Sequence, residues 1–394
     1  SEMCIRDRLY PGEKLPSALF QPVVGNLKLQ KNAQTRTAEM TDILFKYGTS
    51  SATGKLSVRS LSPEEASSLQ AREEEDVLPQ DEIILRDPNN PSEPVTLDNT
   101  PVRQTKLAQH LLPKVVDGSF IFSRLDADPF FDNLSPIAVF LSKTGYFSRT
   151  KDTYALDMMF DVVNYKKDVI HQLKTKISSI PEGLAFKNVS ATLPSNAYVT
   201  GQADLTLGKS VLLSGSLSAQ ADNLNAVLNW LGVPLAEEIP QNLLRQFKAE
   251  TEFKLAQNGL VLSRLKGNLD QTDFSGSMAM RLGSRKAFSV SGDFSEMNLA
   301  QYFPAKNKFY AQKREEFSKL SATQKVQRLF DALAFLNETD ISVKLKTAAF
   351  SWADINAENL SADFSVVRGQ MKINEISGEK VLASEIKLRG DVEG

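Results

Sequence analysis

The chain of 394 residues is long enough for two or three ordinary domains or for one repeat architecture. Its 46 Lys and Arg residues balance its 48 Asp and Glu residues to a formal charge of −2, which gives no basic footprint for nucleic acid. A single cysteine excludes an internal disulfide, and two histidines leave little material for a metal site or a catalytic triad. No run approaches the ~18 apolar residues that span a bilayer as a helix.

The first 105 residues divide into three parts. Residues 1–9 resemble a translated sequencing adapter, so we expect them to be non-native and the natural N-terminus, with any targeting signal or membrane anchor, to be missing. Residues 10–60 are predicted to form a short β segment, because residues 23–29 and 54–58 alternate apolar and polar side chains. Residues 61–105 combine an acidic run with closely spaced prolines, which predicts an irregular insertion.

Residues 106–181 are predicted to be a mixed β/α lead-in. Residues 107–116 are expected to form a short helix, and residues 119–122 and 155–163 to form strands. From residue 165 to 177, Val169, Leu173 and Ile177 lie on one side of a helical projection with lysines between them. This spacing predicts an amphipathic helix.

An internal repeat begins at Gly183. Two segments share a grid of glycine and leucine, and subtraction of residue numbers gives offsets of 75 to 77: Gly183, Leu193, Gly201, Leu207 and Gly215 correspond to Gly259, Leu269, Gly276, Leu282 and Gly292. Five matches in order at a near-constant offset indicate tandem units. The first unit covers residues 182–246 and includes a predicted helix at 222–231, and the second covers 247–305 and ends in a helix at 296–303. A looser third unit covers 339–394, with Gly369, Gly378 and Gly390 at turns.

A helical connector is predicted between the second and third units, over residues 306–338. It is rich in Lys, Gln, Glu and Ala, and Ser321 is a plausible N-cap. Its apolar side chains form a stripe that is expected to pack on the sheet: Val326, Leu329, Phe330, Leu333 and Leu336.

Within the units the apolar side chains recur at every second residue. Ile341, Val343 and Leu345, for example, alternate with polar side chains. Successive side chains of a strand point to opposite faces, so each strand has one apolar and one polar face. Clean alternation favours antiparallel sheets that are wet on one side. The sequence therefore predicts a mainly β fold, an elongated antiparallel repeat sheet curved into an open hydrophobic groove, with a few amphipathic helices.

No motif nominates a catalytic residue, a metal ligand or a cofactor. Gly208-Lys209-Ser210 lacks the glycine that a P-loop needs five residues earlier, where Ala203 stands. The carboxylates around Asp126 and Asp128 are followed by phenylalanines where a calcium loop needs an oxygen ligand and a glycine. We therefore expect a protein that is not an enzyme.

The repeat units resemble the AsmA family of Gram-negative envelope proteins. The resemblance lies in residues 183–205, in 213–217 with the segment 223–232, and in 265–302 of the second unit. It covers residues 157–394, and more faintly 23–59, but Ser195 stands where the family usually has the glycine of Leu-Pro-Gly. The resemblance implies a curved sheet with a hydrophobic groove, located in the periplasm and fixed to the inner membrane by an N-terminal anchor, which we expect to be missing from this sequence. It also implies a role in phospholipid transport and outer-membrane biogenesis, with outer-membrane assembly proteins as possible partners.

The resulting hypothesis is that lipid acyl chains lie in a β groove. Each strand adds apolar side chains to one face, and a buried methylene contributes about 0.8 kcal/mol, so no polar pocket is needed. The proposed lining consists of Leu205, Leu207, Leu213, Leu217, Met278, Met280, Leu282, Phe288, Val290, Phe294, Val343, Leu345, Phe364 and Val366.

Two alternatives remain open at this point. The same alternation would arise if the apolar face were the core of a β-sandwich or lay beneath the 306–338 helix. The chain could also be a structural or assembly-assisting periplasmic protein that binds other envelope proteins and carries no lipid.

Overall fold

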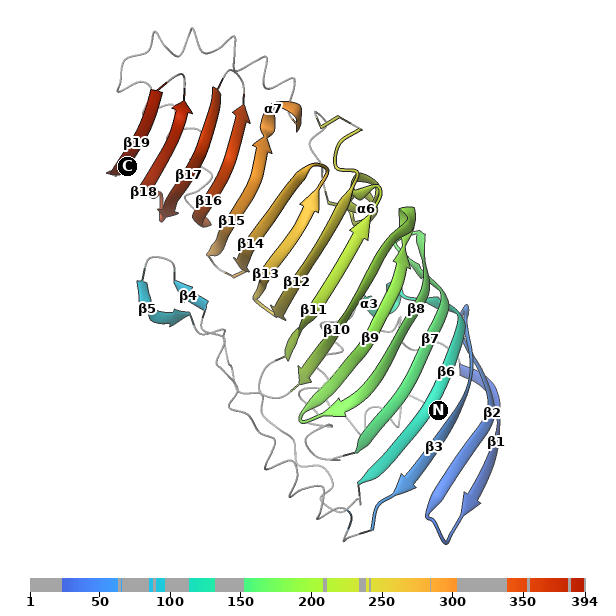
Figure 1. Ribbon diagram of the computed structural model, residues 1–394. Helices are drawn as coiled ribbons and strands as arrows, with labels where there is room; N and C mark the ends of the chain where they lie inside the picture. The colour runs from blue at the N-terminus through green and yellow to red at the C-terminus, as the bar shows by residue number, and fades with distance from the viewer. Residues whose placement is uncertain are drawn as a thin grey trace. The chain divides into compact units, whose positions relative to one another are not determined.

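The computed structural model describes residues 23–62, 65, 85–87, 90–95, 113–131, 152–207, 211–233, 239–240, 242–283, 285–302, 339–352, 355–381 and 384–392. Seventeen of its strands belong to a single open sheet, and two short strands, β4 (Leu85–Asp87) and β5 (Asn90–Val95), form a separate pair (Figure 1). The long sheet is open and mostly antiparallel, which confirms the mainly β fold class predicted from the alternation. It is not curled, so the predicted curvature into a groove is not found. The described residues divide into two units.

The first unit contains the strands up to β9, except the β4–β5 pair, which belongs to the second unit, and most of β10. Neighbours along the chain pair with one another, antiparallel except for β6 with β7. Its elements are β1 (Val23–Asn32), β2 (Thr37–Tyr47), β3 (Ser50–Ser60), β6 (Lys114–Asp126), α3 (Asp128–Phe131), β7 (Thr153–Tyr165), β8 (Asp168–Ile180), β9 (Gly183–Leu193) and β10 (Ala197–Leu207). The 3-10 turn η2 (Pro194–Asn196) before β10 belongs to the second unit.

The second unit contains the strands from β12 onward, and β11 is divided between the two units. From β12 to β19 each strand pairs with the next, antiparallel except for β15 with β16. The elements are β11 (Val211–Ala221), α6 (Leu224–Leu231), β12 (Phe247–Ala256), β13 (Gly259–Leu269), β14 (Thr272–Arg281), β15 (Lys286–Asn298), α7 (Leu299–Tyr302), β16 (Thr339–Trp352), β17 (Ile355–Val367), β18 (Gln370–Val381) and β19 (Ser384–Val392).

The two tandem units found in the sequence have the same order of elements. β9, β10, β11 and α6 of the first correspond to β13, β14, β15 and α7 of the second. Gly183 and Gly259 are the first residues of β9 and β13, and Leu193 and Leu269 are the last. These four grid residues therefore mark where strands begin and end, whereas the other grid glycines lie within strands: Gly201, Gly215, Gly276 and Gly292.

One predicted helix is a strand. The stretch from 165 to 177 lies almost wholly in β8, which forms a hairpin with β7 through Lys166 and Lys167. Val169, Leu173 and Ile177 are spaced by four, and this spacing shares a face in a strand as well as in a helix. Both turn lysines have positive φ, 49° and 64°, as a two-residue hairpin turn requires but as lysine rarely adopts. The residue types at positions 166 and 167 therefore do not indicate a hairpin turn.

Other predictions in the irregular regions are met in part. The strands expected at 119–122 and 155–163 lie within β6 and β7. The helix expected at 222–231 is α6, and the one expected at 296–303 is only α7, because β15 extends to Asn298. The 61–105 insertion contains the β4–β5 pair, in spite of Pro91 and Pro94 in β5. The adapter-like residues, the 306–338 connector and most of the 107–116 segment lie outside the described residues.

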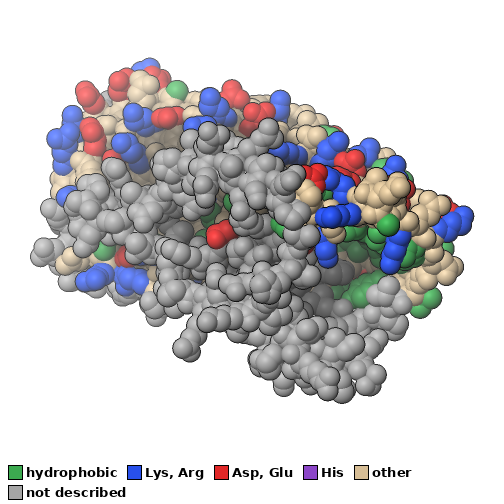
Figure 2. Space-filling model, turned by 90° about the horizontal axis from the view of Figure 1, so that it is seen from below, with side chains coloured by type: hydrophobic (Ala, Val, Ile, Leu, Met, Phe, Trp, Pro, Cys, Tyr) green, Lys and Arg blue, Asp and Glu red, His purple; other side chains and the backbone are tan. Residues whose placement is uncertain are grey.

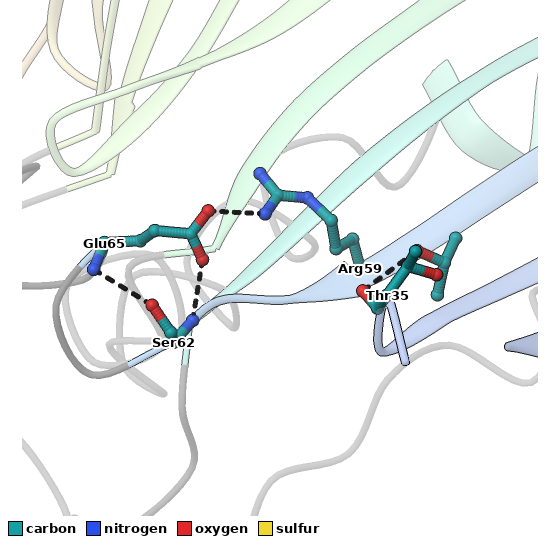
Figure 3. A network of polar contacts seen from close by, with 5 residues as sticks. Thr35, Arg59, Ser62 and Glu65 are labelled. Carbon is teal, nitrogen blue, oxygen red and sulfur yellow. Dashed lines mark hydrogen bonds and ion pairs between the residues drawn. The ribbon is translucent and has the colours of Figure 1, made fainter. Parts of the chain in front are cut away.

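A small polar network closes the end of β3 (Figure 3). The Ser62 hydroxyl accepts a hydrogen bond from the Glu65 amide at 3.2 Å, and the Glu65 carboxylate accepts one from the Ser62 amide at 2.8 Å. These reciprocal bonds are a capping box. Arg59, on β3, donates to the other carboxylate oxygen at 2.7 Å. The Ser62 amide, followed by Arg59, lowers the pKa of Glu65 to about 2.

Few large side chains are fully buried in the described part of the chain. Leu61 and Val163 are the largest that are less than 2% exposed, and many other buried apolar residues are alanines. The extensive contacts among described elements join neighbouring strands, together with short contacts of α6 with η2 and of α7 with β16. Within these residues the sheet is a single layer, so its apolar face must be examined as a surface.

Candidate functional site

Two apolar rows cross the second unit from β12 to β18. Residues that are directly paired in neighbouring strands point to the same face of a sheet, so the pairing register identifies each row. The first row is Phe253, Leu262, Met278, Val290, Val343, Phe364 and Ile373. The second is Leu255, Leu260, Met280, Phe288, Ile341, Val366 and Met371. We call these the central rows.

A row with small residues lies beside the central rows. Gly276 pairs with Gly292, and the row continues through Leu345, Ala362, Ile376 and Leu388. A Cβ at Gly276 would overlap the carbonyl oxygen of Ser291, so glycine is required there by a close backbone approach. The next row holds Phe274 and Phe294, whose ring centroids are 6.4 Å apart. The apolar face therefore spans several residues along each strand.

Nine of the fourteen predicted lining residues share this face. They are Met278, Met280, Phe288, Val290, Phe294, Val343, Leu345, Phe364 and Val366. Leu282 lies one residue beyond β14, in the turn, and is 46% exposed. The remaining four lie on β10 and β11: Leu205, Leu207, Leu213 and Leu217, of which Leu207 is buried and Leu217 is exposed.

The central rows also contain residues that were missed from the sequence, such as Leu260, Leu262 and Ile373. A signal was available, because β12 and β13 are joined by a two-residue turn between Ala256 and Gly259. A short hairpin turn fixes the register of the two strands, and the register carries the apolar row from one strand to the next. The sequence prediction considered strands one at a time.

The first unit has its own apolar face, which sequence reasoning did not single out. Phe45, Ala52, Phe122, Phe160 and Leu173 form one row across β2, β3, β6, β7 and β8. The Phe122 and Phe160 rings are stacked with centroids 4.6 Å apart, and the Phe45 ring meets Phe122 edge-on at 5.7 Å. Ala52 is 1% exposed between the rings. We call this row the phenylalanine row.

The opposite face of the second unit is polar and carries cross-strand ion pairs. In the second unit Lys344 pairs with Asp363 at 3.9 Å, and Glu375 is approached by Lys387 at 3.6 Å and Arg389 at 3.7 Å. Figure 2 shows basic and acidic side chains interspersed over the described surface, with hydrophobic side chains gathered beside them. Exposed pairs of this kind contribute little to stability, so this face is an ordinary wet surface.

The central rows are not covered by another described element. Of the large side chains in these rows, Val366 is buried at 2% exposure, while Phe288, Val290, Val343 and Phe364 are only partly buried. In a two-layer β fold such side chains would form the core. Within the described residues they remain a surface.

A hollow of about 320 Å³ lies at one end of strands β15 to β18, beside the apolar face. Glu296, Ala349 and Glu358 line it and are directly paired, two residues beyond Phe294, Thr347 and Leu360 respectively. Met297, Phe350 and Ala357, the row one residue further on, line it as well. Lys380 of β18 reaches Glu358 at 2.7 Å. The Glu358 hydrogen bond and charge, with Glu379, raise the pKa of Lys380.

Polar groups elsewhere in the second unit brace the turns. The Asp270 carboxylate accepts hydrogen bonds from the amides of Leu244, Arg245 and Gln246 and from the Tyr302 hydroxyl at 3.1 Å. Burial, and then the charge of Asp270, raise the pKa of Tyr302 to about 12. These hydrogen bonds join the segment before β12 to the β13–β14 turn and to α7.

The described residues contain no group of three or more His, Cys, Asp or Glu side chains placed to hold a metal ion. His171 is exposed on β8, and His110 lies outside the described residues. No helix in the described ranges is long and apolar enough to cross a membrane. Comparison with protein-family models and with curated proteins finds no match to the chain.

Proposed function

We propose that the chain shields lipid acyl chains on the apolar face of its sheet, as part of phospholipid transport between the inner and outer membranes of a Gram-negative envelope. The observation that carries the proposal is the pair of central rows, which cross β12 to β18 and have no described layer over them. The resemblance of the repeats to the AsmA family supports the same function and a periplasmic location with an anchor in the inner membrane.

The length of the central rows suits an acyl chain. Six strand spacings from β12 to β18 extend about 29 Å. One leaflet of a bilayer, half of its ~30 Å hydrocarbon core, accommodates one extended acyl chain. A central row is therefore long enough for a complete chain.

The separation of the two rows suits a lipid with two chains. They are two residues apart along each strand, for example at Phe288 and Val290, which is about 6.8 Å. A single chain of about 14 carbons binds a hydrophobic phase only marginally, and stable attachment takes a second signal. Because each buried methylene contributes about 0.8 kcal/mol, two parallel rows double the available gain. This supports a diacyl lipid as the cargo.

The composition of the rows suits chains of variable length and unsaturation. Met278, Met280 and Met371 contribute unbranched side chains that repack easily, and no charged side chain stands among the fourteen residues of the central rows. No buried polar group would have to be left unpaired by an apolar ligand.

The test is lipid retention by a pair of adjacent variants on β15. Val290→Asp places a charge in the first central row, between Met278 and Val343. Ser291→Asp places the same charge one residue away on the polar face, opposite Lys344. We expect mass spectrometry of protein purified without added lipid to find phospholipid in the wild type and in Ser291→Asp, and about tenfold less in Val290→Asp.

Circular dichroism and thermal unfolding should show that both variants are folded. If a folded Val290→Asp variant retained as much lipid as the wild type, the central rows would not be the lipid-binding surface. Absence of phospholipid from the wild type would favour the alternative, an envelope protein that binds other proteins.

A further inference from the structure

We infer that the hollow at the end of β15 to β18 binds the head group of a zwitterionic phospholipid, one that carries an amine beside its phosphate. The inference rests on the proposed function, because it assumes that acyl chains lie on the adjoining face. It adds the class of lipid that the protein selects.

The position of the hollow is the first argument. Its Glu296–Ala349–Glu358 row follows the apolar face along three neighbouring strands, two residues past Phe294, Thr347 and Leu360. On β15 and β17 the surface therefore changes from apolar to charged over about 7 Å, from Phe294 to Glu296 and from Leu360 to Glu358, whereas Thr347 is followed by Ala349 on β16. An amphipathic lipid needs the same change between its chains and its head group.

The size and lining of the hollow are the second argument. A volume of about 320 Å³ falls at the lower end of small-molecule sites, which combine apolar walls with a few convergent polar groups. Here the apolar walls are Met297, Phe350 and Ala357. The Phe350 ring can also attract a cation to its face.

The charges of the hollow identify the head group. Glu358 and Lys380 form an ion pair at 2.7 Å and neutralise one another. Glu296 lines the same hollow and makes no hydrogen bond or ion pair with another described residue, so the three groups sum to a charge of −1. An ammonium group between Glu296 and Glu358 would compensate that charge.

A lipid without an amine meets the opposite situation. The phosphate of a glycerol-type head group brings only negative charge towards Glu296 and Glu358, and its single compensating partner, Lys380, is already paired. The hollow therefore discriminates by charge between two lipids whose acyl chains are the same.

The experiment is a competition on the full chain. Purified protein is incubated with vesicles of equimolar phosphatidylethanolamine and phosphatidylglycerol, and the bound lipids are identified by mass spectrometry. We expect phosphatidylethanolamine to be preferred by about two- to fivefold, the worth of one exposed ion pair. Glu296→Gln should reduce that preference to about parity and leave the total bound lipid unchanged.

The control is Glu250→Gln, which removes the same charge from an exposed position on β12, away from the hollow. This variant should bind phosphatidylethanolamine and phosphatidylglycerol in the same ratio as the wild type. An unchanged ratio of the two bound lipids in Glu296→Gln would overturn the head-group assignment and leave the proposed function standing. Absence of bound lipid from every protein would overturn both.

Discussion

The apolar faces of the two units are built differently. In the first unit, the phenylalanine row packs ring on ring, with the Phe122 ring between Phe45 and Phe160. In the second unit, the central rows consist mainly of methionine and aliphatic side chains with single phenylalanines between them. Stacked rings bury surface against one another and have little conformational freedom, whereas the flexible methionine side chain can repack around the groups that it contacts.

This difference suggests a division of labour. A face whose side chains already pack on one another gains less from a ligand than one whose side chains lack partners above them. We therefore expect the phenylalanine row to contribute more to the stability of the folded chain and the central rows to contribute more to lipid binding. The following variants test that division.

The largest effect is expected at a glycine beneath a ring of the first unit. A Cβ at Gly54 would lie 2.5 Å from both the Phe120 ring and the Ser119 carbonyl oxygen. Gly54→Val must displace both, so we expect it to lower the free energy of unfolding by about 3 kcal/mol in urea titrations.

The matched control is Gly283→Val in the second unit, where a Cβ would have nothing within 4 Å. It should change the free energy of unfolding by less than about 0.5 kcal/mol. If the two substitutions lowered the free energy of unfolding equally, the close packing of Gly54 against the Phe120 ring would not be a special requirement for the stability of the first unit.

The second prediction compares the rows directly. Phe122→Ala removes the central ring of the phenylalanine row, and because Phe122 is only partly buried we expect a loss of about 2 kcal/mol. Val343→Ala in the first central row should cost about 1 kcal/mol, yet it should lower lipid retention more than Phe122→Ala does. Lipid loss confined to Phe122→Ala would reverse the division of labour.

The strand pattern could be predicted from the sequence because it is local. Alternation such as that of Ile341, Val343 and Leu345 depends only on the period of a strand, and the repeat grid depends only on spacing. The 165–177 segment failed because a spacing of four fits both periods and because the deciding turn, at Lys166 and Lys167, has unusual backbone angles.

The rows could not be predicted in the same way because they are properties of the register. The contact of Phe45 with Phe122 depends on strand β3 lying between β2 and β6, with Ala52 small enough to fit between the rings. The sequence separates these residues by the long 61–105 insertion, and alternation alone does not say which strands are neighbours. The hollow lined by Glu296 and Lys380 was missed for the same reason.

The third prediction concerns the polar bracket of the second unit. Arg285 donates to one carboxylate oxygen of Asp340 at 2.8 and 2.6 Å, and the Arg368 amide donates to the same oxygen at 3.0 Å. Burial opposes ionisation of Asp340, but these hydrogen bonds and the charge of Arg285 outweigh it and lower the pKa of the carboxyl. The bracket joins the start of β15 to β16 and to the β17–β18 turn.

Asp340→Asn should lower the free energy of unfolding by about 1 kcal/mol at pH 7. Because the folded-state pKa lies below the usual 3.8, the stabilisation is present above that value and is lost as the pH falls through the folded-state pKa. Urea titrations of the wild type and the variant should therefore converge in strong acid. If the difference in unfolding free energy between the wild type and the variant persisted in strong acid, the loss of stability would come from packing rather than from the charge of Asp340.

The smallest effect is expected at the corresponding bracket of the first unit, where the Arg59–Glu65–Ser62 network is exposed to solvent. The pKa of Glu65 in the folded chain is about 2, below the ordinary value of 4.5. Any stabilisation by its carboxylate is therefore fully present at pH values above 4.5 and is lost as the pH falls through about 2. Carbon NMR of the carboxyl group should give that midpoint. Since the Ser62 amide is the larger cause and Arg59 the smaller, Arg59→Gln should raise the midpoint but leave it below 4.5. A wild-type midpoint at 4.5 would show that the capping box does not form, and the first unit would then depend on its phenylalanine row without a polar bracket at the end of β3.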